Sequence, residues 1–217
     1  MAFQFELPQL ADELSPKAKD VINIGFLVER LTEENRKRVA HRSERPENVA
    51  EHTLMVGKIA VAIAQKYYPD LDPGKVAIYA LAHDDHEAYI GDIPSGEWCG
   101  TDYQQKASLD EAGIGQLEKE FGDSLPDYVG TVVAYNQQTE PEARFVRMVD
   151  KLAVPVQHVV DGGQQVNEHF TLESYLSNER HRREKVKDYD DWQEMIDLMA
   201  ELACYIADHL VDRTTTP

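Results

Sequence analysis

The 217-residue chain has little cysteine and no long apolar run. Its two cysteines, Cys99 and Cys204, form no CxxC pair, which argues against a disulfide framework or a thiolate zinc site and favours a reducing, cytoplasmic compartment. No stretch of 18 uncharged apolar residues occurs, and the acidic start MAFQFELPQLADEL lacks the basic and apolar parts of a secretion signal. We therefore expect neither export nor a membrane-spanning helix.

Positive charge is scarce as well. The 22 Lys and Arg residues stand against 40 Asp and Glu residues, which gives a formal net charge of -18 at pH 7. Such an excess opposes stable binding to nucleic acid or to an anionic membrane, although a small anionic ligand can bind where basic residues converge. The length and the 42% hydrophobic content predict a single domain over residues 1–217 with a substantial core.

Strand-like alternation is also missing, whereas apolar residues recur at helical spacing along most of the chain. Ser15, Asn48 and the DPG motif at 72–74 each begin an expected helix, and the third of these should run on to the GDIP motif at residue 91. Further helices are expected near residues 106–121, 125–137, 141–159 and 189–212. The predicted fold class is all-α, an irregular helical bundle.

Two segments do not fit a regular helix. The basic run NRKRVAHRSERP after the first helix is interpreted as a helix end followed by a loop. Residues 161–189 are polar, dense in charge and begin with a Gly pair. This polar segment is interpreted as either a partly ordered lid or a solvated connection.

Against this background, LAHDDHEAYIGDIP (81–94) is unusual, because it combines the apolar spacing of a buried helix with five consecutive ionisable residues, His83 to Glu87. Nearly all of them resist burial unless something satisfies them. A divalent cation would do so, since imidazole and carboxylate groups become inexpensive to bury once they are coordinated. His83 and Asp84 are therefore candidate ligands.

Two other segments offer further ligands. His52 falls in line with Val49 and Val56 on the apolar face of its helix, and Asp150 lies in the apolar context RFVRMVDKLAV. Each has a simpler explanation when taken alone. His52 would be a core histidine with one satisfied hydrogen bond, and Asp150 would pair with Arg147 or Lys151.

Three blocks, RPENVAEH, HDDHEAYIGDIP and MVDKLA, occur in this order, and together they resemble the HD-domain metal-dependent phosphohydrolases, closest to the 5'-deoxynucleotidase branch. The resemblance runs from about residue 27 to residue 156, which would form the metal-binding core of an HD-type bundle. It implies that His52, His83, Asp84 and Asp150 bind one divalent metal ion. Two imidazoles and two carboxylates suit Mn, Co, Fe, Ni, Zn or Mg, so the ion is not specified.

The resemblance also implies roles for two acidic residues. Glu87 would position or deprotonate the attacking water, and Asp92 of GDIP would lie near the substrate, although a residue of the helix-ending turn explains Asp92 equally well. HD proteins with two metals have additional histidines before the last Asp. Here only His86 lies in that interval, off the stripe of His83 and Glu87, so one metal is expected and His86 is assigned to the surface or to a supporting contact.

A phosphate ester needs positive groups, and the basic run supplies candidates for substrate binding just before the His52 helix: Arg36, Lys37, Arg38, Arg42 and Arg45. A solvated helix end is the alternative. The 5'-deoxynucleotidase branch has an Arg-Trp pair where Lys37 and Arg38 stand here, so the Trp is missing. Trp98 could stack on a base or simply anchor its loop.

The leading prediction is a phosphohydrolase of deoxynucleoside 5'-monophosphates. One alternative is a deoxynucleoside triphosphate triphosphohydrolase, for which the five basic residues would have a purpose. A second is a nucleotide sensor that keeps the metal site without turnover. Relatives of this kind commonly form homodimers, so a homodimer is expected, and the apolar stripe of the last helix would either close the core or form the dimer seam.

Overall fold

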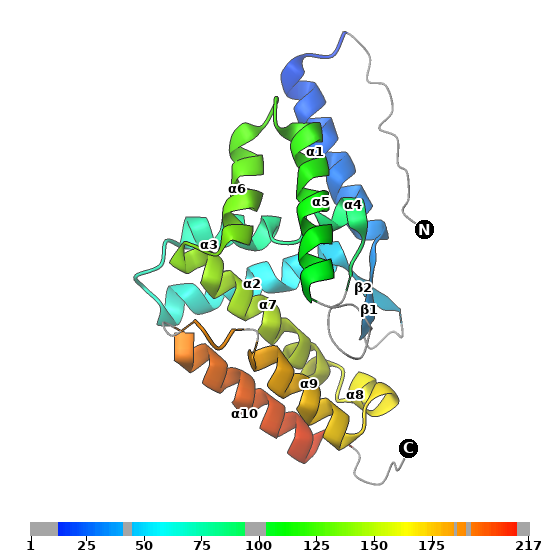
Figure 1. Ribbon diagram of the computed structural model, residues 1–217, viewed down its shortest axis with the longest axis vertical. Helices are drawn as coiled ribbons and strands as arrows, with labels where there is room; N and C mark the ends of the chain where they lie inside the picture. Colours follow the sequence, from blue (N-terminus) through cyan, green and yellow to red (C-terminus); the bar gives the residue numbers. More distant parts are fainter. Residues whose placement is uncertain (1–12, 41–44, 94–102, 185, 190–191, 212–217) are drawn as a thin grey trace.

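A computed structural model describes residues 13–40, 45–93, 103–184, 186–189 and 192–211 (Figure 1). Ten helices and two short strands occur in these ranges. The helices are α1 (Pro16–Glu33), α2 (Val49–Tyr67), α3 (Pro73–Ala82), α4 (Glu87–Ile90), α5 (Tyr103–Phe121), α6 (Pro126–Gln137), α7 (Pro141–Val160), α8 (Gln164–His169), α9 (Leu172–Glu184) and α10 (Gln193–His209). The prediction of an all-α fold is confirmed. In the described part, no helix combines the length and the apolar character needed to cross a bilayer.

The helices lie in three tiers joined by α7 (Figure 1). Helices α1, α5 and α6 form the upper tier, α2 and α3 cross the middle, and α8, α9 and α10 form the lower tier. Helix α7 contacts α2 and α3 as well as α10, and Phe145, Met148 and Val149 on it are fully buried. The middle of α7 therefore lies at the centre of the main core.

Two of the central helices begin at well-formed caps. The Asn48 side chain accepts a hydrogen bond from the Glu51 backbone N–H (2.9 Å), and the Glu51 side chain accepts one from the Asn48 N–H (3.2 Å). The Asp72 carboxylate caps α3 through the N–H groups of Gly74 and Lys75. Such caps contribute about 1 kcal/mol each and fix where a helix starts. The starts of α2 and α3 were therefore readable from the sequence.

The basic run differs from the expected helix end and loop. Strand β1 (Asn35–Ala40) pairs in antiparallel fashion with β2 (Pro46–Asn48), with Asn35 opposite Asn48 and an irregular register between the two paired ends. The pairing continues into the helices, since the Val49 N–H donates to the Glu34 carbonyl (3.0 Å). A partner strand of three residues is too short to show alternation, which explains why the sequence pattern did not indicate it.

The helical parts of the polar segment 161–189 are not a solvated connection. The segment contains α8 and α9, whose Val166 and Tyr175 pack with Ile206 of α10 in a separate buried cluster. Helix α10 begins at Gln193 rather than at residue 189, and its stripe of Met195, Met199 and Ile206 is at most 1% exposed. Of the two roles foreseen for this stripe, the structure therefore shows closure of the core.

Candidate metal centre

The HDDHE motif forms a turn and not the continuous helix expected over residues 72–91. Helix α3 ends at Ala82, and tight bonds follow from the Asp85 N–H to the Ala82 carbonyl (3.3 Å) and from the Glu87 N–H to the Asp84 carbonyl (2.9 Å). Gly91, with a φ of 78°, then ends α4. Because i to i−3 bonds wind the chain more tightly than an α-helix, neighbouring side chains in the turn leave the helical stripe. His83 and Asp84 thus reach the same site although they are adjacent in sequence.

The four expected ligands come together from three elements, the start of α2, this turn and the middle of α7. His52 Nε2 lies 3.0 Å from Asp150 Oδ1 and 3.7 Å from Asp84 Oδ2, and His83 Nε2 lies 3.0 Å from Asp84 Oδ2. Ligand atoms of His52, His83 and Asp150 all lie within 4.8 Å of one another. Metal–ligand bonds of about 2.1 Å allow one ion to bridge groups at this spacing.

The chemistry of the donors also fits a cation. His83 is fully buried, and its Nδ1 is bonded to the Ala80 carbonyl (2.9 Å), which directs Nε2 toward the carboxylates. That Nε2 has no hydrogen-bond partner in the described structure, because its contact with Asp84 is poorly aligned. A buried lone pair held in place by a backbone carbonyl on the other ring nitrogen is the usual setting of a metal-binding histidine.

The charges of the site point the same way. Burial, together with the nearby Arg36, lowers the pKa of His52 to about 4, so this ring is neutral at pH 7 as metal binding requires. Burial alone would lower the pKa of His83 too, but Asp84 and Asp150 outweigh it and raise that pKa. A bound cation would take the place of the proton that the two carboxylates favour on His83.

Asp84 and Asp150 are held as carboxylates. Burial would raise the pKa of each, but His83 next to Asp84 and Lys151 next to Asp150 lower both. The Lys151 ammonium lies 2.5 Å from Asp150 Oδ2, while Oδ1 faces His52. The pairing of Asp150 with Lys151 that the sequence offered as an alternative therefore coexists with a ligand position.

Among the basic residues of the basic run whose side chains are described, Arg36 reaches the site. Arg36 Nη1 lies 3.6 Å from Asp84 Oδ2, and its Nε lies 3.4 Å from Oε2 of the buried Glu47. Arg45 instead pairs with Glu51 on the exposed side of α2. The side chains of Lys37 and Arg38 are not described, and Arg42 and Trp98 lie outside the described residues.

Glu87 and Asp92 follow the turn. Glu87 is 4% exposed, its Oε2 has no hydrogen-bond partner in the described structure, and burial together with Asp84 and Asp92 raises its pKa well above the usual value. The Asp92 backbone N–H donates to Glu34 Oε1 (3.2 Å), and its charge acts on both Glu87 and Arg36. Asp92 is thus a turn residue that also lies near the site, so neither interpretation excludes the other.

His86 is not a surface residue. It is 4% exposed, and its Nε2 lies 3.2 Å from Asp110 Oδ1 on α5. Lys106, one turn before Asp110, lies 2.9 Å from the same oxygen and 3.9 Å from Glu87 Oε1. From the sequence, only a helix is expected here, since Lys and Asp four residues apart also suit an exposed helix face.

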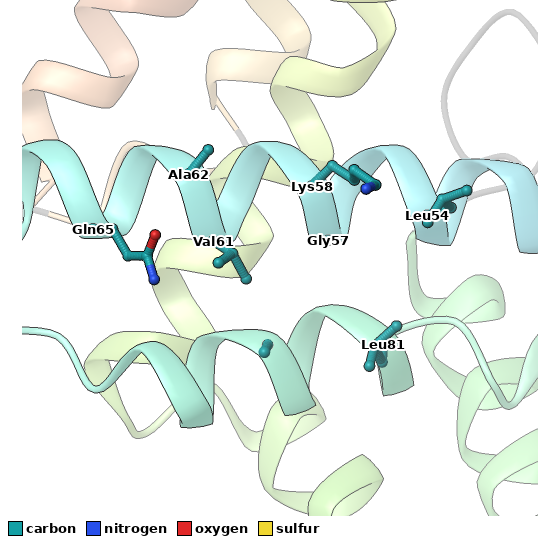
Figure 2. Close-up of a pocket in the computed structure, with 8 residues that line it drawn as sticks. Leu54, Gly57, Lys58, Val61, Ala62, Gln65 and Leu81 are labelled. Carbon is teal, nitrogen blue, oxygen red and sulfur yellow. The ribbon is translucent and has the colours of Figure 1, made fainter.

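A separate hollow lies between α2 and α3 on the outside of the molecule (Figure 2). It encloses about 400 Å³ and is lined by Leu54, Gly57, Lys58, Val61, Ala62, Gln65, Ala77 and Leu81. None of the candidate ligands lines it. Figure 2 shows Leu54, Lys58 and Val61 along one wall and Leu81 on the other.

Comparison with known proteins gives this geometry a family. The family model described as the HD domain matches residues 28–190, three quarters of the chain. The chain belongs to the HD-domain family. The HD-domain resemblance predicted from the sequence is thereby confirmed, and the matched range extends past residue 156 to include α8 and α9.

Curated relatives and solved structures agree with this assignment. A 5'-deoxynucleotidase of Erwinia tasmaniensis is 25% identical over 158 residues, which cover 68% of this chain and 78% of that protein. A 5'-deoxynucleotidase of Vibrio parahaemolyticus is 27% identical over 121 residues, and here the chain spans only 60% of the relative. A protein from Magnetospirillum magnetotacticum, described as a predicted metal-dependent phosphohydrolase, shares the HD-domain fold with a TM-score of 0.62 at 18% identity, covering 87% of this chain and 97% of that one.

Proposed function

We propose that this HD-domain protein is a divalent-metal-dependent phosphohydrolase that cleaves deoxynucleoside 5'-monophosphates into deoxynucleoside and inorganic phosphate. The observation that carries the proposal is the set of the buried His52 and His83 with the partly buried Asp150, next to Asp84 and Glu87. The curated relatives named 5'-deoxynucleotidase support the choice of substrate.

His52, His83, Asp84 and Asp150 would hold the metal. When bound, it would supply Lewis acidity toward the phosphate and lower the pKa of a coordinated water. His83 is held by Ala80 and Asp150 by Lys151, so these ligands keep their orientation with or without substrate. Such preorganisation reduces the cost of reaching the transition state.

Glu87 would accept the proton of the attacking water, and Arg36 would offset the negative charge of the phosphate. Water attacks phosphorus, the bond from phosphorus to the 5' oxygen breaks, and Glu87 accepts the proton that the water loses before it is passed to the leaving oxygen. The pKa of Glu87 is raised by burial, which makes this carboxylate a stronger base than an exposed one. Arg36, already facing Asp84, offsets the charge of the phosphate, and Asp92 lies near the substrate.

Product identification tests the proposal. The protein is incubated with dAMP, AMP and dATP in turn, with Mn²⁺ or Co²⁺ and with an EDTA control, and the products are separated by anion exchange. We expect release of phosphate from dAMP but not from AMP. Residues other than the missing Trp would then recognise the deoxyribose. Tripolyphosphate from dATP would instead identify a triphosphohydrolase, and binding of all three nucleotides without turnover would identify a sensor.

We also propose a cytoplasmic homodimer, in which two copies meet at the hollow between α2 and α3. The stripe of α10 is buried within the chain, whereas Leu54 and Leu81 at the hollow are 58% and 59% exposed. A two-fold dimer uses the same patch on both subunits, so copies that meet at this hollow would bury the exposed Leu54 and Leu81 of both chains. Light scattering should give twice the chain mass, and the mass of one chain for Leu81→Glu but not for Tyr205→Glu.

A further inference from the structure

Helix α5 brings a cation next to Glu87 that the HD motif itself does not contain. Lys106 Nζ lies 3.9 Å from Glu87 Oε1, within ion-pair range but too long for a hydrogen bond. Its side chain is 24% exposed, so Lys106 is more enclosed than the surface lysines of the molecule, such as Lys75 at 50%. Glu87 itself is almost fully buried, where a nearby cation matters most.

The position of this ammonium is fixed from two sides. Asp110, one turn later on α5, lies 2.9 Å from Lys106 Nζ and also faces His86 Nε2 at 3.2 Å. His86 immediately precedes Glu87, so the chain of contacts from His86 through Asp110 to Lys106 returns to the turn that carries Glu87. Helix and turn are thereby bound to each other at two adjacent residues.

Close backbone packing keeps α5 in register with that turn. A Cβ atom at Gly113 would lie 2.8 Å from the His86 carbonyl oxygen, closer than real contacts allow. Glycine therefore permits α5 to approach the turn at van der Waals distance. Lys106 lies two turns before this contact on the same helix, so its place relative to Glu87 follows from rigid packing.

We propose that Lys106 is a positioning residue for Glu87. Its ammonium faces Oε1, which leaves the buried Oε2, itself without a hydrogen-bond partner in the described structure, as the acceptor for the proton of the attacking water. Lys106 thereby selects the orientation of the Glu87 carboxylate, and Asp110 and His86 hold Lys106 in place. This inference rests on the proposed hydrolytic role of Glu87.

Kinetics of four variants on dAMP with Mn²⁺ test the inference. Lys106→Met should lower kcat about 10-fold to 100-fold with KM within about twofold, since an orienting contact acts on the transition state. Lys106→Arg should recover part of kcat. Lys106→Gln, which can still hydrogen-bond Asp110, should behave like Lys106→Met. Lys119→Met, at an exposed lysine of the same helix, should behave like the wild type.

A double-variant cycle separates this role from a general structural one. If Lys106 acts through Glu87, adding Lys106→Met to Glu87→Gln should lower kcat no further than Glu87→Gln alone. Independent, multiplying losses would overturn the inference. A raised KM at unchanged kcat would also overturn it, because it would show direct contact of Lys106 with the phosphate, and so would wild-type kinetics of Lys106→Met.

A structural measurement keeps the inference separate from the proposed function. If the wild type hydrolyses none of the nucleotides, the proposed function fails, and the crystal structure of metal-free Lys106→Met still decides the positioning role. Rotation of the Glu87 carboxylate with an intact contact between His86 and Asp110 would support it. A Glu87 side chain in its wild-type position would overturn it.

Discussion

Two buried histidines in this protein have almost the same surroundings and opposite properties. His83 in the candidate metal centre is 0% exposed, and His158 on α7 is 4% exposed. Each has one ring nitrogen without a hydrogen-bond partner in the described structure. Each also packs edge-on against a tyrosine, with ring centroids 5.9 Å apart. The tyrosines are Tyr135 for His83 and Tyr175 for His158. Geometry of the ring alone therefore does not distinguish a ligand from a core residue.

The charged neighbours make the difference. Asp84 and Asp150 raise the pKa of His83, whereas burial and the guanidinium of Arg182 lower the pKa of His158 to about 3. A site rich in carboxylates attracts a cation, and a site with a neighbouring cation repels one. The comparison teaches that a candidate ligand should be judged by the charges that surround it.

Removal of ligands should show the largest contrast. His83→Ala and Asp150→Ala are expected to lose the bound metal and about 10³-fold or more of kcat, because several kcal/mol of transition-state stabilisation depend on the ion. His158→Ala should retain both. Metal content of the purified proteins by mass spectrometry is the measurement. Unchanged metal in both site variants would remove the basis of the proposed site.

Glu87 and Glu179 are both buried, but we expect only Glu87 to take part in catalysis. Glu87→Gln should keep the metal but lower kcat about 10²-fold to 10⁴-fold, as expected for loss of a general base. Glu179, 2% exposed and paired with Arg182 in the lower tier, has no contact with the centre. Glu179→Gln should therefore leave kcat near the wild-type value once its folded fraction has been measured by circular dichroism.

Added metal should stabilise the fold through the site of His52, His83, Asp84 and Asp150 alone. At a free concentration 100 times the dissociation constant, a ligand that binds only the folded state raises the free energy of unfolding by about 2.7 kcal/mol. We expect this gain, measured by urea unfolding with Mn²⁺ against EDTA, in the wild type and in His158→Phe. The same gain in Asp150→Ala would contradict the assignment of that carboxylate.

Acid should destabilise the protein through His158. The unfolded chain protonates this ring below about pH 6.5 and the folded chain only near pH 3, so the free energy of unfolding falls as pH decreases between these values, by about 1.4 kcal/mol per pH unit. From pH 6.5, where the unfolded ring is already half protonated, to pH 5 the contribution is about 1.6 kcal/mol. Urea unfolding of EDTA-treated wild type and His158→Phe at both pH values should show a smaller loss for the variant by that amount. Equal losses would mean that His158 is protonated in the folded state.

The sequence predicted best where the signal was local and periodic. Helical spacing located α2, α3 and α7, and caps marked the starts of α2 and α3. The phase of His52 and Asp150 on their helices was enough to expect both in one core. The sequence did not predict elements whose interaction partner is distant in the chain or only a few residues long. The break after Ala82 and the strand at Asn35 depend on contacts made only in the folded chain.

Other residues were missed because their types fit an ordinary alternative. Lys106 and Asp110 have the spacing of an exposed helix pair, and no pattern in the sequence connects them with His86. The polar composition of residues 161–189 concealed Val166 and Tyr175, which are buried in a cluster with residues of α10. Periodicity over a few residues cannot indicate such contacts.

Gly113 sets the distance between α5 and the turn that carries His86 and Glu87. Because Gly113 has no side chain, α5 can lie close to the His86 carbonyl. The methyl group of Gly113→Ala would clash with that oxygen and push the helix away from the turn. This substitution would increase the distance between Lys106 and Glu87 without changing any ionisable group. Gly113 is therefore a position from which the distance between Lys106 and Glu87 can be changed, two helical turns away from Lys106.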